Sequence, residues 1–235
     1  MILGRAEGRR PLVIGHRGAA AVAPENTLAS LEAAVAARVD LVEFDISPGL
    51  LLGHSLDELP PDALTLDEAF EFLKAHGVGV HLDVKLPGYE EEVLEAIRRH
   101  GVAERAVLST AFAVTARRFA RLAPELPRAI GYPRDRLGVS NLRWPLPLQR
   151  AGAMTMRQAM PVRVPLLLRW ARANTLSLHH TLCSRAAVAT AHRLGAPVLA
   201  WTVNDESGVR RLAAAGVDGI VSDDPEMTLA TLLAL

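Results

Sequence analysis

The sequence has little cysteine and little lysine for its 235 residues. A single cysteine, Cys183, excludes an internal disulfide framework, and a lone cysteine is most often a small buried apolar side chain. Lysine occurs only at Lys74 and Lys85, so arginine carries nearly all of the positive charge. Acidic and basic residues balance to a formal net charge of zero. The composition therefore gives no reason to expect nucleic acid as a partner.

Long apolar runs are also missing. No apolar stretch reaches the length needed to span a bilayer. The first fifteen residues, MILGRAEGRRPLVIG, lack the apolar region and cleavage site of a signal peptide, so we expect a cytoplasmic protein. Half of the residues are apolar and 22% are charged, a balance typical of globular proteins. The length is compatible with a single domain over residues 1–235.

Short β-rich stretches alternate with longer helical ones. The expected strands are 12–14, 40–46, 78–85, 105–110, 127–132, 175–178, 197–203 and 218–222. The expected helices are 27–37, 64–76, 89–100, 112–123, 184–195, 206–216 and 225–235. This alternation indicates an α/β protein with a parallel sheet, and eight units in this length match a (β/α)8 TIM barrel. A doubly wound sheet is the alternative, but GHRGAAA (15–21) lacks the GxGxxG spacing of its nucleotide-binding turn.

Acidic side chains follow two neighbouring strands at the end where such a barrel has its active site. Glu43 and Asp45 are two residues apart on a strand, so they share a face, and Asp83 and Lys85 do the same on the next strand. Clustered carboxylates repel one another unless a cation or a proton intervenes, and oxygen ligands suit Mg²⁺ or Ca²⁺. We predict one divalent cation held by Glu43, Asp45 and Asp83. A salt-bridge layer closed by Lys85 and Arg17 is the alternative.

Two histidines accompany these carboxylates. His16 ends the first strand in VIGHRGAAAVAPENT (13–27), and His54 follows the second strand after a short loop. An imidazole titrates near neutrality, which suits a general acid or base. Arg17 and Lys85 supply positive charge for phosphoryl oxygens. Five other histidines are expected to end helices or to lie merely near the site: His76, His100, His179, His180 and His192.

These motifs, in this order, resemble the glycerophosphodiester phosphodiesterase family of the PLC-like phosphodiesterase superfamily. GHRG (15–18), PENT (24–27), EFD (43–45) and the Gly-His step at 53–54 are similar to its N-terminal signature. AWTVND (200–205) and GVDGIVSDDP (216–225) are similar to its closing signature. The resemblance implies a barrel enzyme that hydrolyses glycerophosphodiesters to sn-glycerol 3-phosphate and an alcohol with the aid of one divalent cation.

The resemblance also implies residue roles. Glu43 and Asp45 match the metal-binding pair, and Asp83 stands where the family usually has a glutamate ligand. His16 and His54 match the catalytic histidines. One would remove the proton of the glycerol 2-hydroxyl as it attacks phosphorus, and the other would protonate the leaving alcohol. Water would then open the resulting cyclic phosphate. The residues implied to bind substrate are Arg17, Glu25, Lys85 and Trp201.

The chain departs from the family around His54. The preceding stretch, ISPGLLLG (46–53), is short, Ser55 replaces the usual aspartate, and most of the insertion between this histidine and the next helix is missing. Two alternatives stay open for this reason. One is a lysophospholipase-D-like activity on lysophospholipids. The other is a catalytically degenerate barrel that binds a phospho-ligand, in which the short loop has displaced His54.

Residues 132–172, the basic segment, carry eight arginines against one acid, Asp135. The segment also contains Trp144 and the apolar run VPLLLRW (164–170). It is either a solvated helix face or a surface for peripheral contact with an anionic membrane. Its arginines are Arg134, Arg136, Arg143, Arg150, Arg157, Arg163, Arg169 and Arg172.

Overall fold

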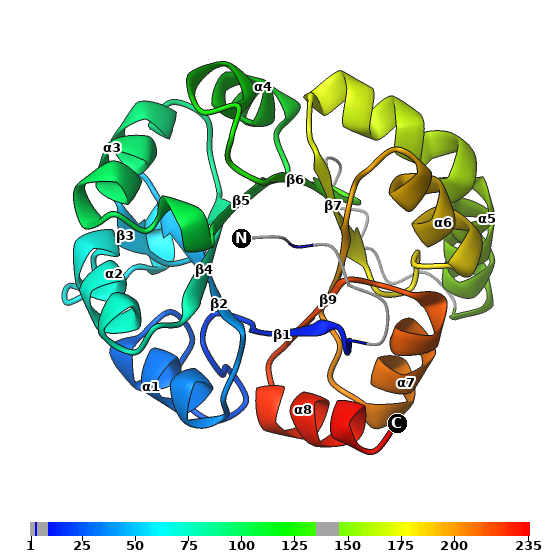
Figure 1. Ribbon diagram of the computed structural model, residues 1–235, viewed down its shortest axis with the longest axis horizontal. Coiled ribbons are helices and arrows are strands. Elements are labelled where there is room, and N and C mark those ends of the chain that lie inside the picture. Colours follow the sequence, from blue (N-terminus) through cyan, green and yellow to red (C-terminus); the bar gives the residue numbers. More distant parts are fainter. Residues whose placement is uncertain (1–2, 4–8, 135–145) are drawn as a thin grey trace.

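Parallel strands form a closed ring in the computed structural model, which describes residues 3, 9–134 and 146–235 (Figure 1). The strands are β1 (Leu12–Gly15), β2 (Leu41–Ser47), β4 (Gly79–Val84), β5 (Ala106–Thr110), β6 (Arg128–Tyr132), β7 (Thr175–His179), β8 (Val198–Trp201) and β9 (Gly219–Ser222). The ring closes because β1 pairs in parallel with both β2 and β9. This closure confirms the predicted (β/α)8 barrel and excludes the doubly wound sheet.

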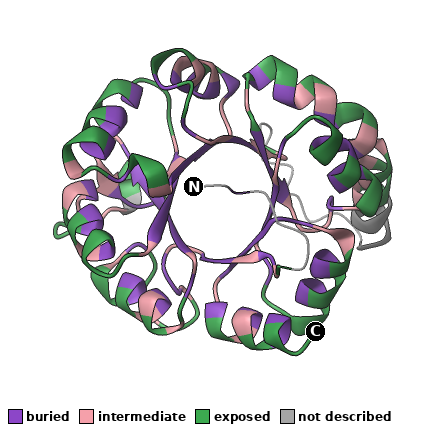
Figure 2. Ribbon diagram, in the orientation of Figure 1, coloured by how far each residue is buried: buried purple, intermediate pink, exposed green. Residues whose placement is uncertain are grey.

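Helices surround the ring and cover its outer face (Figure 1). They are α1 (Leu28–Ala36), α2 (Leu66–Ala75), α3 (Glu90–His100), α4 (Ala113–Leu122), α5 (Leu146–Ala171), α6 (Arg185–Arg193), α7 (Glu206–Ala215) and α8 (Pro225–Leu233). Thr65 and Glu68 form the capping box that begins α2. Figure 2 shows that the residues of each helix that face the barrel are buried and that those on its outer side are exposed. Among the described residues, no helix is long and apolar enough to cross a membrane.

Two elements differ from the sequence-based expectation. A two-residue strand, β3 (Leu51–Leu52), turns back antiparallel to β2 through Pro48 and Gly49, and Gly49 has the positive φ (83°) of a type II turn. The basic segment contains α5, although Pro161 and Pro165 lie inside it and prolines usually end a helix. Asp135, Arg136, Arg143 and Trp144 lie outside the described residues, as does the side chain of Arg150.

The two ends of the barrel interior have opposite chemistry. Leu3, Ile14, Leu41, Val107, Leu199 and Val221 form an apolar cluster near the amino ends of the strands. Farther along β2, the side chains of Val42, Phe44 and Ile46 join the main core, whereas Glu43 and Asp45 lie on the opposite face of the strand. The apolar layer therefore closes one end, and the polar side chains collect at the other.

The loop after β1 returns tightly against the barrel and α1. The amide of His16 donates to Ser222 O (2.8 Å), and the amide of Gly18 donates to Glu43 O (3.1 Å). The hydroxyl of Ser30 in α1 donates to Arg17 O (2.8 Å). Gly18 has a φ of +89°, and a Cβ there would lie 2.5 Å from the carbonyl carbon of Ser30. Only glycine fits this position without moving the loop.

Gly18→Ala should therefore lower the free energy of unfolding by about 3 kcal/mol or more, because both the backbone angle and the space are unfavourable. Gly77→Ala is the matched control, since Gly77 also has a positive φ (+71°) but nothing lies within 4 Å of its added Cβ. We expect it to cost only about 1 kcal/mol. Urea denaturation followed by circular dichroism measures both, and equal losses would contradict the close approach at Gly18.

Candidate active site

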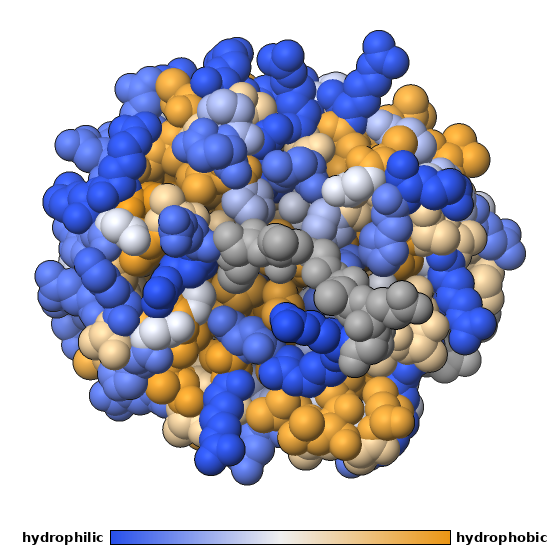
Figure 3. All heavy atoms as spheres, in the orientation of Figure 1, coloured by the Kyte–Doolittle hydropathy of each residue, from blue (hydrophilic) through white to orange (hydrophobic). Residues whose placement is uncertain are grey.

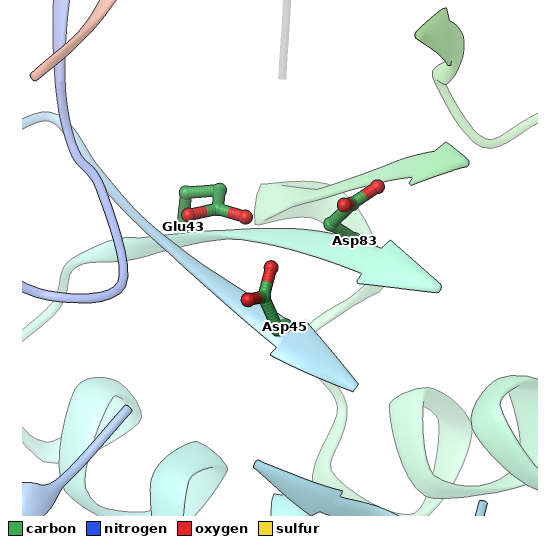
Figure 4. Close-up of side chains that lie close together, drawn as sticks. All are labelled: Glu43, Asp45 and Asp83. Atoms are coloured by element: carbon green, nitrogen blue, oxygen red, sulfur yellow. The ribbon is translucent and has the colours of Figure 1, made fainter. Parts of the chain in front are cut away.

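Three carboxylates converge inside the polar end of the barrel, as the sequence predicts (Figure 4). Glu43 and Asp45 project from β2, and Asp83 projects from the adjacent strand β4, where it is paired in register with Asp45. One oxygen from each carboxylate lies within 4.8 Å of the others. Glu43 and Asp45 are only 4% and 1% exposed. Such a buried group of negative charges requires compensation.

The positive side chains around the cluster compensate its three carboxylates to different degrees, as the pKa shifts show. Burial raises the pKa of Glu43 to about 7, and the charges of Asp45 and Asp83 add to this effect despite the opposing influence of His16. Burial would also raise the pKa of Asp45, but His54, Lys85 and Arg17 hold it below its usual range. The pKa of Asp83 is likewise lowered, because Lys85 outweighs burial. Glu43 is thus the member that keeps its proton most readily.

This donor set fits a hard divalent cation. All three groups offer carboxylate oxygens that lie close together, and Glu43 and Asp45 are almost fully buried, so water cannot compensate their charge. A bound cation would also favour the ionised form of Glu43, whose proton reduces repulsion in its absence. Glu43, Asp45 and Asp83 are accordingly the residues that could hold a metal ion.

Lys85 and Arg17 flank the carboxylates. The Lys85 Nζ lies 2.6 Å from Asp45 Oδ1 and 2.6 Å from Asp83 Oδ2. The Arg17 Nε lies 3.0 Å from Asp45 Oδ2, and its Nη1 lies 2.6 Å from Glu25 Oε1. These ion pairs raise the pKa of both basic groups despite burial. Two fixed positive charges therefore border the cavity beside the acidic group.

The backbone of the β1–α1 loop supports this arrangement. Arg17 and Asn26 both have a positive φ, at 49° and 59°, and the amide of Asn26 donates to Arg17 O (3.0 Å). The Arg17 amide donates to Glu43 Oε2 (2.9 Å). The buried Asn26 side chain accepts from the Asp45 amide through Oδ1 (3.0 Å). Asn26 thus joins the loop to the acidic strand, a role that its place in PENT did not reveal.

His16 is held by the far end of the chain. Its Nδ1 lies 2.5 Å from Asp223 Oδ1, while its Nε2 points toward Glu43 Oε2 at 3.9 Å. Burial alone would lower the pKa of His16, but the hydrogen bond to Asp223 and the charge of Glu43 raise it. Asn204 in turn holds Asp223, accepting its amide hydrogen through Oδ1 (3.0 Å). The sequence places Asp223 at the end of a strand but does not identify it as this partner.

His54 reaches the same carboxylates from the loop that follows β3. Its Nδ1 lies 3.3 Å from Asp45 Oδ2 and 3.2 Å from an Arg17 guanidinium nitrogen, and its side chain is 53% exposed. The preceding Gly53 is fixed to β2, because its amide donates to Asp45 O (3.0 Å) and its carbonyl accepts from the Ser47 hydroxyl (2.8 Å). The short loop therefore keeps His54 at the carboxylates and does not displace it.

A cavity of about 720 Å³ opens over these groups. Its lining includes the three carboxylates, both histidines, Arg17, Lys85 and Trp201. Glu25 is the one predicted substrate-binding residue that does not line it, although its carboxylate holds Arg17. His179 packs edge-on against Trp201, with ring centroids 5.2 Å apart. Burial lowers the pKa of His179 to about 4, so this residue is neutral at pH 7.

Two polar residues that line the cavity, Ser109 and His81, are not among the site residues that the sequence predicts. The Ser109 hydroxyl donates to Asp83 Oδ1 (2.7 Å). His81 is buried beside Glu43 on β4, its ring nitrogens have no hydrogen-bond partner within the described ranges, and burial lowers its pKa to about 4. Three helix-end histidines have partners elsewhere, namely His76 with Phe72 O, His100 with Asp67 and His192 with Asp218.

Residues 16–47 and 53–227 match the model of the glycerophosphoryl diester phosphodiesterase family. The unmatched residues 48–52 coincide with the turn and β3. A putative glycerophosphodiester phosphodiesterase of Bacillus subtilis is 25% identical over 92% of this chain and 96% of its own length. The same identity and coverage hold for a glycerophosphodiester phosphodiesterase of Caldanaerobacter subterraneus subsp. tengcongensis.

Solved structures share the fold. A putative glycerophosphoryl diester phosphodiesterase from Silicibacter pomeroyi superposes with a TM-score of 0.75 at 22% identity, covering 98% of this chain and 95% of the other. A phosphodiesterase from Oleispira antarctica, in complex with the product sn-glycerol-3-phosphate, has a TM-score of 0.71 at 24% identity. That match covers 94% of this chain and 96% of the other.

The raised pKa of Glu43 predicts pH-dependent cation binding. Because the proton on Glu43 must leave when a cation binds, the apparent affinity for Mg²⁺ or Ca²⁺ should rise up to about tenfold per pH unit below pH 7 and level off above it. Calorimetric titration of chelator-treated protein between pH 5.5 and 8 measures this.

Two variants test whether Glu43 is the source of the pH dependence. Glu43→Gln should weaken binding and remove most of the pH dependence, whereas Asp67→Asn should leave both unchanged, because Asp67 lies outside the barrel in contact with Arg99. If the unaltered protein binds the cation with an affinity that does not depend on pH, then the cation does not displace a proton from Glu43, and the prediction is wrong.

Proposed function

The chain belongs to the glycerophosphoryl diester phosphodiesterase family and is a phosphoric diester hydrolase, and we propose that it hydrolyses glycerophosphodiesters to sn-glycerol 3-phosphate and an alcohol. The observation that carries this proposal is the placement of two histidines at one buried carboxylate group, His16 beside Glu43 and His54 beside Asp45. The bound product in the Oleispira antarctica structure supports the choice of substrate.

The phosphate would lie against the positive side of the cavity. Arg17 and Lys85 are already fixed by ion pairs to Asp45, so little side-chain entropy is lost when they receive a phosphoryl group. Glu25 orients the Arg17 guanidinium from the other side. A divalent cation held by Glu43, Asp45 and Asp83, either Mg²⁺ or Ca²⁺, would supply Lewis-acid stabilisation of the phosphoryl charge. Trp201 would contribute an apolar wall.

His16 and His54 would transfer the protons. One histidine accepts the proton of the glycerol 2-hydroxyl as that oxygen bonds to phosphorus, and the other gives a proton to the alcohol whose bond to phosphorus breaks. Water then attacks the cyclic phosphate, and the proton transfers run in reverse. Asp223 holds Nδ1 of His16, which leaves Nε2 facing the carboxylates and the cavity. This fixed orientation supports the assignment of His16 as a proton carrier.

The first test is release of sn-glycerol 3-phosphate from glycerophosphocholine. Release should require Mg²⁺ or Ca²⁺ and stop with chelator. His16→Ala and His54→Ala should each lower kcat/KM by about 10²–10⁴-fold. His76→Ala should have no effect, because His76 contacts Phe72 of the preceding helix turn and does not line the cavity.

The outcomes separate the alternatives. Turnover that survives chelation, or that survives loss of either histidine in a folded variant, would contradict the mechanism. Release from lysophosphatidylcholine without release from glycerophosphocholine would favour the lysophospholipase-D-like activity. Binding of glycerol 3-phosphate without any turnover would favour a degenerate phospho-ligand-binding barrel.

We further propose that α5 makes peripheral contact with an anionic membrane. Val162, Leu166 and Trp170 are exposed at successive spacings of four residues, which places them along one side of the helix, and Met154 is exposed earlier in it. Figure 3 shows apolar side chains over α5 with charged ones beside them. The helix sequence has four arginines and no acid. Tyr132, Arg163 and Trp170 help to line a shallow hollow there. An apolar stripe with arginines beside it is suited to an anionic lipid surface.

Sedimentation with vesicles of equal parts phosphatidylglycerol and phosphatidylcholine tests this contact. The protein should bind at low salt and dissociate at high salt. Leu166→Glu should lower the partition coefficient at least about tenfold, since burial of one leucine is worth roughly 1.5–3 kcal/mol. Leu233→Glu on α8 is the control at an equally exposed leucine. Absence of sedimentation, or equal binding to pure phosphatidylcholine, would reject the contact.

A further inference from the structure

A second cavity, of about 380 Å³, lies on the other side of His54. We call it the loop cavity, because residues 52–64 form much of its wall together with the start of α1. His54 lines both cavities, and its half-exposed ring stands between them. Both cavities therefore border the imidazole that the proposed reaction uses.

The lining of the loop cavity is apolar and acidic. Leu28, Leu52, Leu59 and Leu64 form its apolar wall, and Leu28 is 42% exposed. Among the side chains that the structure describes, the acids that line it are Glu25 and Asp62, and no lysine or arginine does. Glu25 is paired with Arg17, whereas Asp62 is exposed and makes no ion pair with a described residue. An apolar wall with one uncompensated carboxylate favours a cation with apolar substituents.

The site cavity, unlike the loop cavity, presents positive side chains as well as carboxylates. Arg17, Lys85 and Arg134 line it beside the carboxylates. A substrate with an anionic phosphate and a cationic alcohol would thus meet matching charge on both sides of His54. A neutral, polyhydroxylated alcohol would place hydroxyl groups against the leucine wall and would bring no cation to Asp62.

We propose that the loop cavity is the subsite for the alcohol half of the diester and that it selects small alkylammonium alcohols of the choline type. This inference rests on the proposed phosphodiesterase function. The contacts are ionic attraction to Asp62 and apolar contact of the N-methyl groups with Leu28 and Leu59. The loop that holds His54 thereby also determines which alcohol is released.

The test compares two diesters, glycerophosphocholine and glycerophosphoglycerol, in the unaltered protein and in charge-reversal variants. The unaltered protein should prefer glycerophosphocholine in kcat/KM. Asp62→Lys should reduce that preference by about fivefold or more, because it replaces attraction with repulsion at short range. Free choline should inhibit competitively, and more weakly in this variant.

Asp57→Lys is the matched control. Asp57 is an exposed acid on the same loop, but it lines the site cavity and not the loop cavity. It should change turnover of both diesters alike and leave their ratio unchanged. An unaltered ratio in Asp62→Lys, or an equal change of the ratio in both variants, would overturn the proposal.

Failure of the proposed function can be distinguished from failure of the subsite assignment. If the unaltered protein hydrolyses neither diester, the proposed function itself fails. Leu28→Asn should impair glycerophosphocholine hydrolysis. If it impairs only the hydrolysis of lysophosphatidylcholine, the loop cavity holds an acyl chain, and the assignment to a cationic alcohol is wrong.

Discussion

Charge compensation of Asp45 is the interaction on which the site depends. This carboxylate is almost fully buried, and its oxygens lie against Lys85, Arg17 and His54, while Asn26 binds the adjacent backbone. These partners come from the β1–α1 loop, the end of β4 and the loop after β3. Loss of one partner would leave a buried charge with less compensation, which is strongly unfavourable. The same contacts that stabilise Asp45 therefore place the proposed phosphate-binding and proton-transferring groups around one point.

Positive side chains do not compensate the charge of every carboxylate in the group, because Glu43 lacks such a partner among Lys85 and Arg17. Lys85 and Arg17 are directed to Asp45 and Asp83, and the pKa of Glu43 rises to about 7 because burial and its neighbours disfavour its charge. With Glu43 ionised, the cluster would need positive charge beyond that of the basic side chains that contact it. A divalent cation supplies that charge through the oxygen ligands already present. The argument for a metal site is thus electrostatic as well as geometric.

The local pattern of residues in the sequence predicts much of the fold and of the candidate site. Alternation along β2 and β4 was sufficient to place Glu43, Asp45 and Asp83 together, because neighbouring parallel strands bring the same face to the same end. Contacts made by closure of the barrel were not accessible in this way. Asp223 meets His16 across 207 positions in the sequence because β9 pairs with β1. A helix face was one interpretation of the basic segment, but the bounds of α5 were not predicted, because Pro161 and Pro165 interrupt the local signal for a helix.

The short loop after β2 connects catalysis with the choice of substrate. Its first part forms β3 and fixes Gly53 to β2, so that His54 stays beside Asp45. Its later part, with Leu59, Asp62 and Leu64, walls the loop cavity. A change of loop length would therefore act on two properties at once, since it would move the imidazole and the alcohol-binding wall together. Substitutions at exposed wall positions avoid this coupling, because they leave the Ser47–Gly53 hydrogen bond intact. If the loop cavity is the alcohol subsite, selectivity can therefore diverge without loss of the catalytic geometry through side chains on the later part of this loop and the facing start of α1.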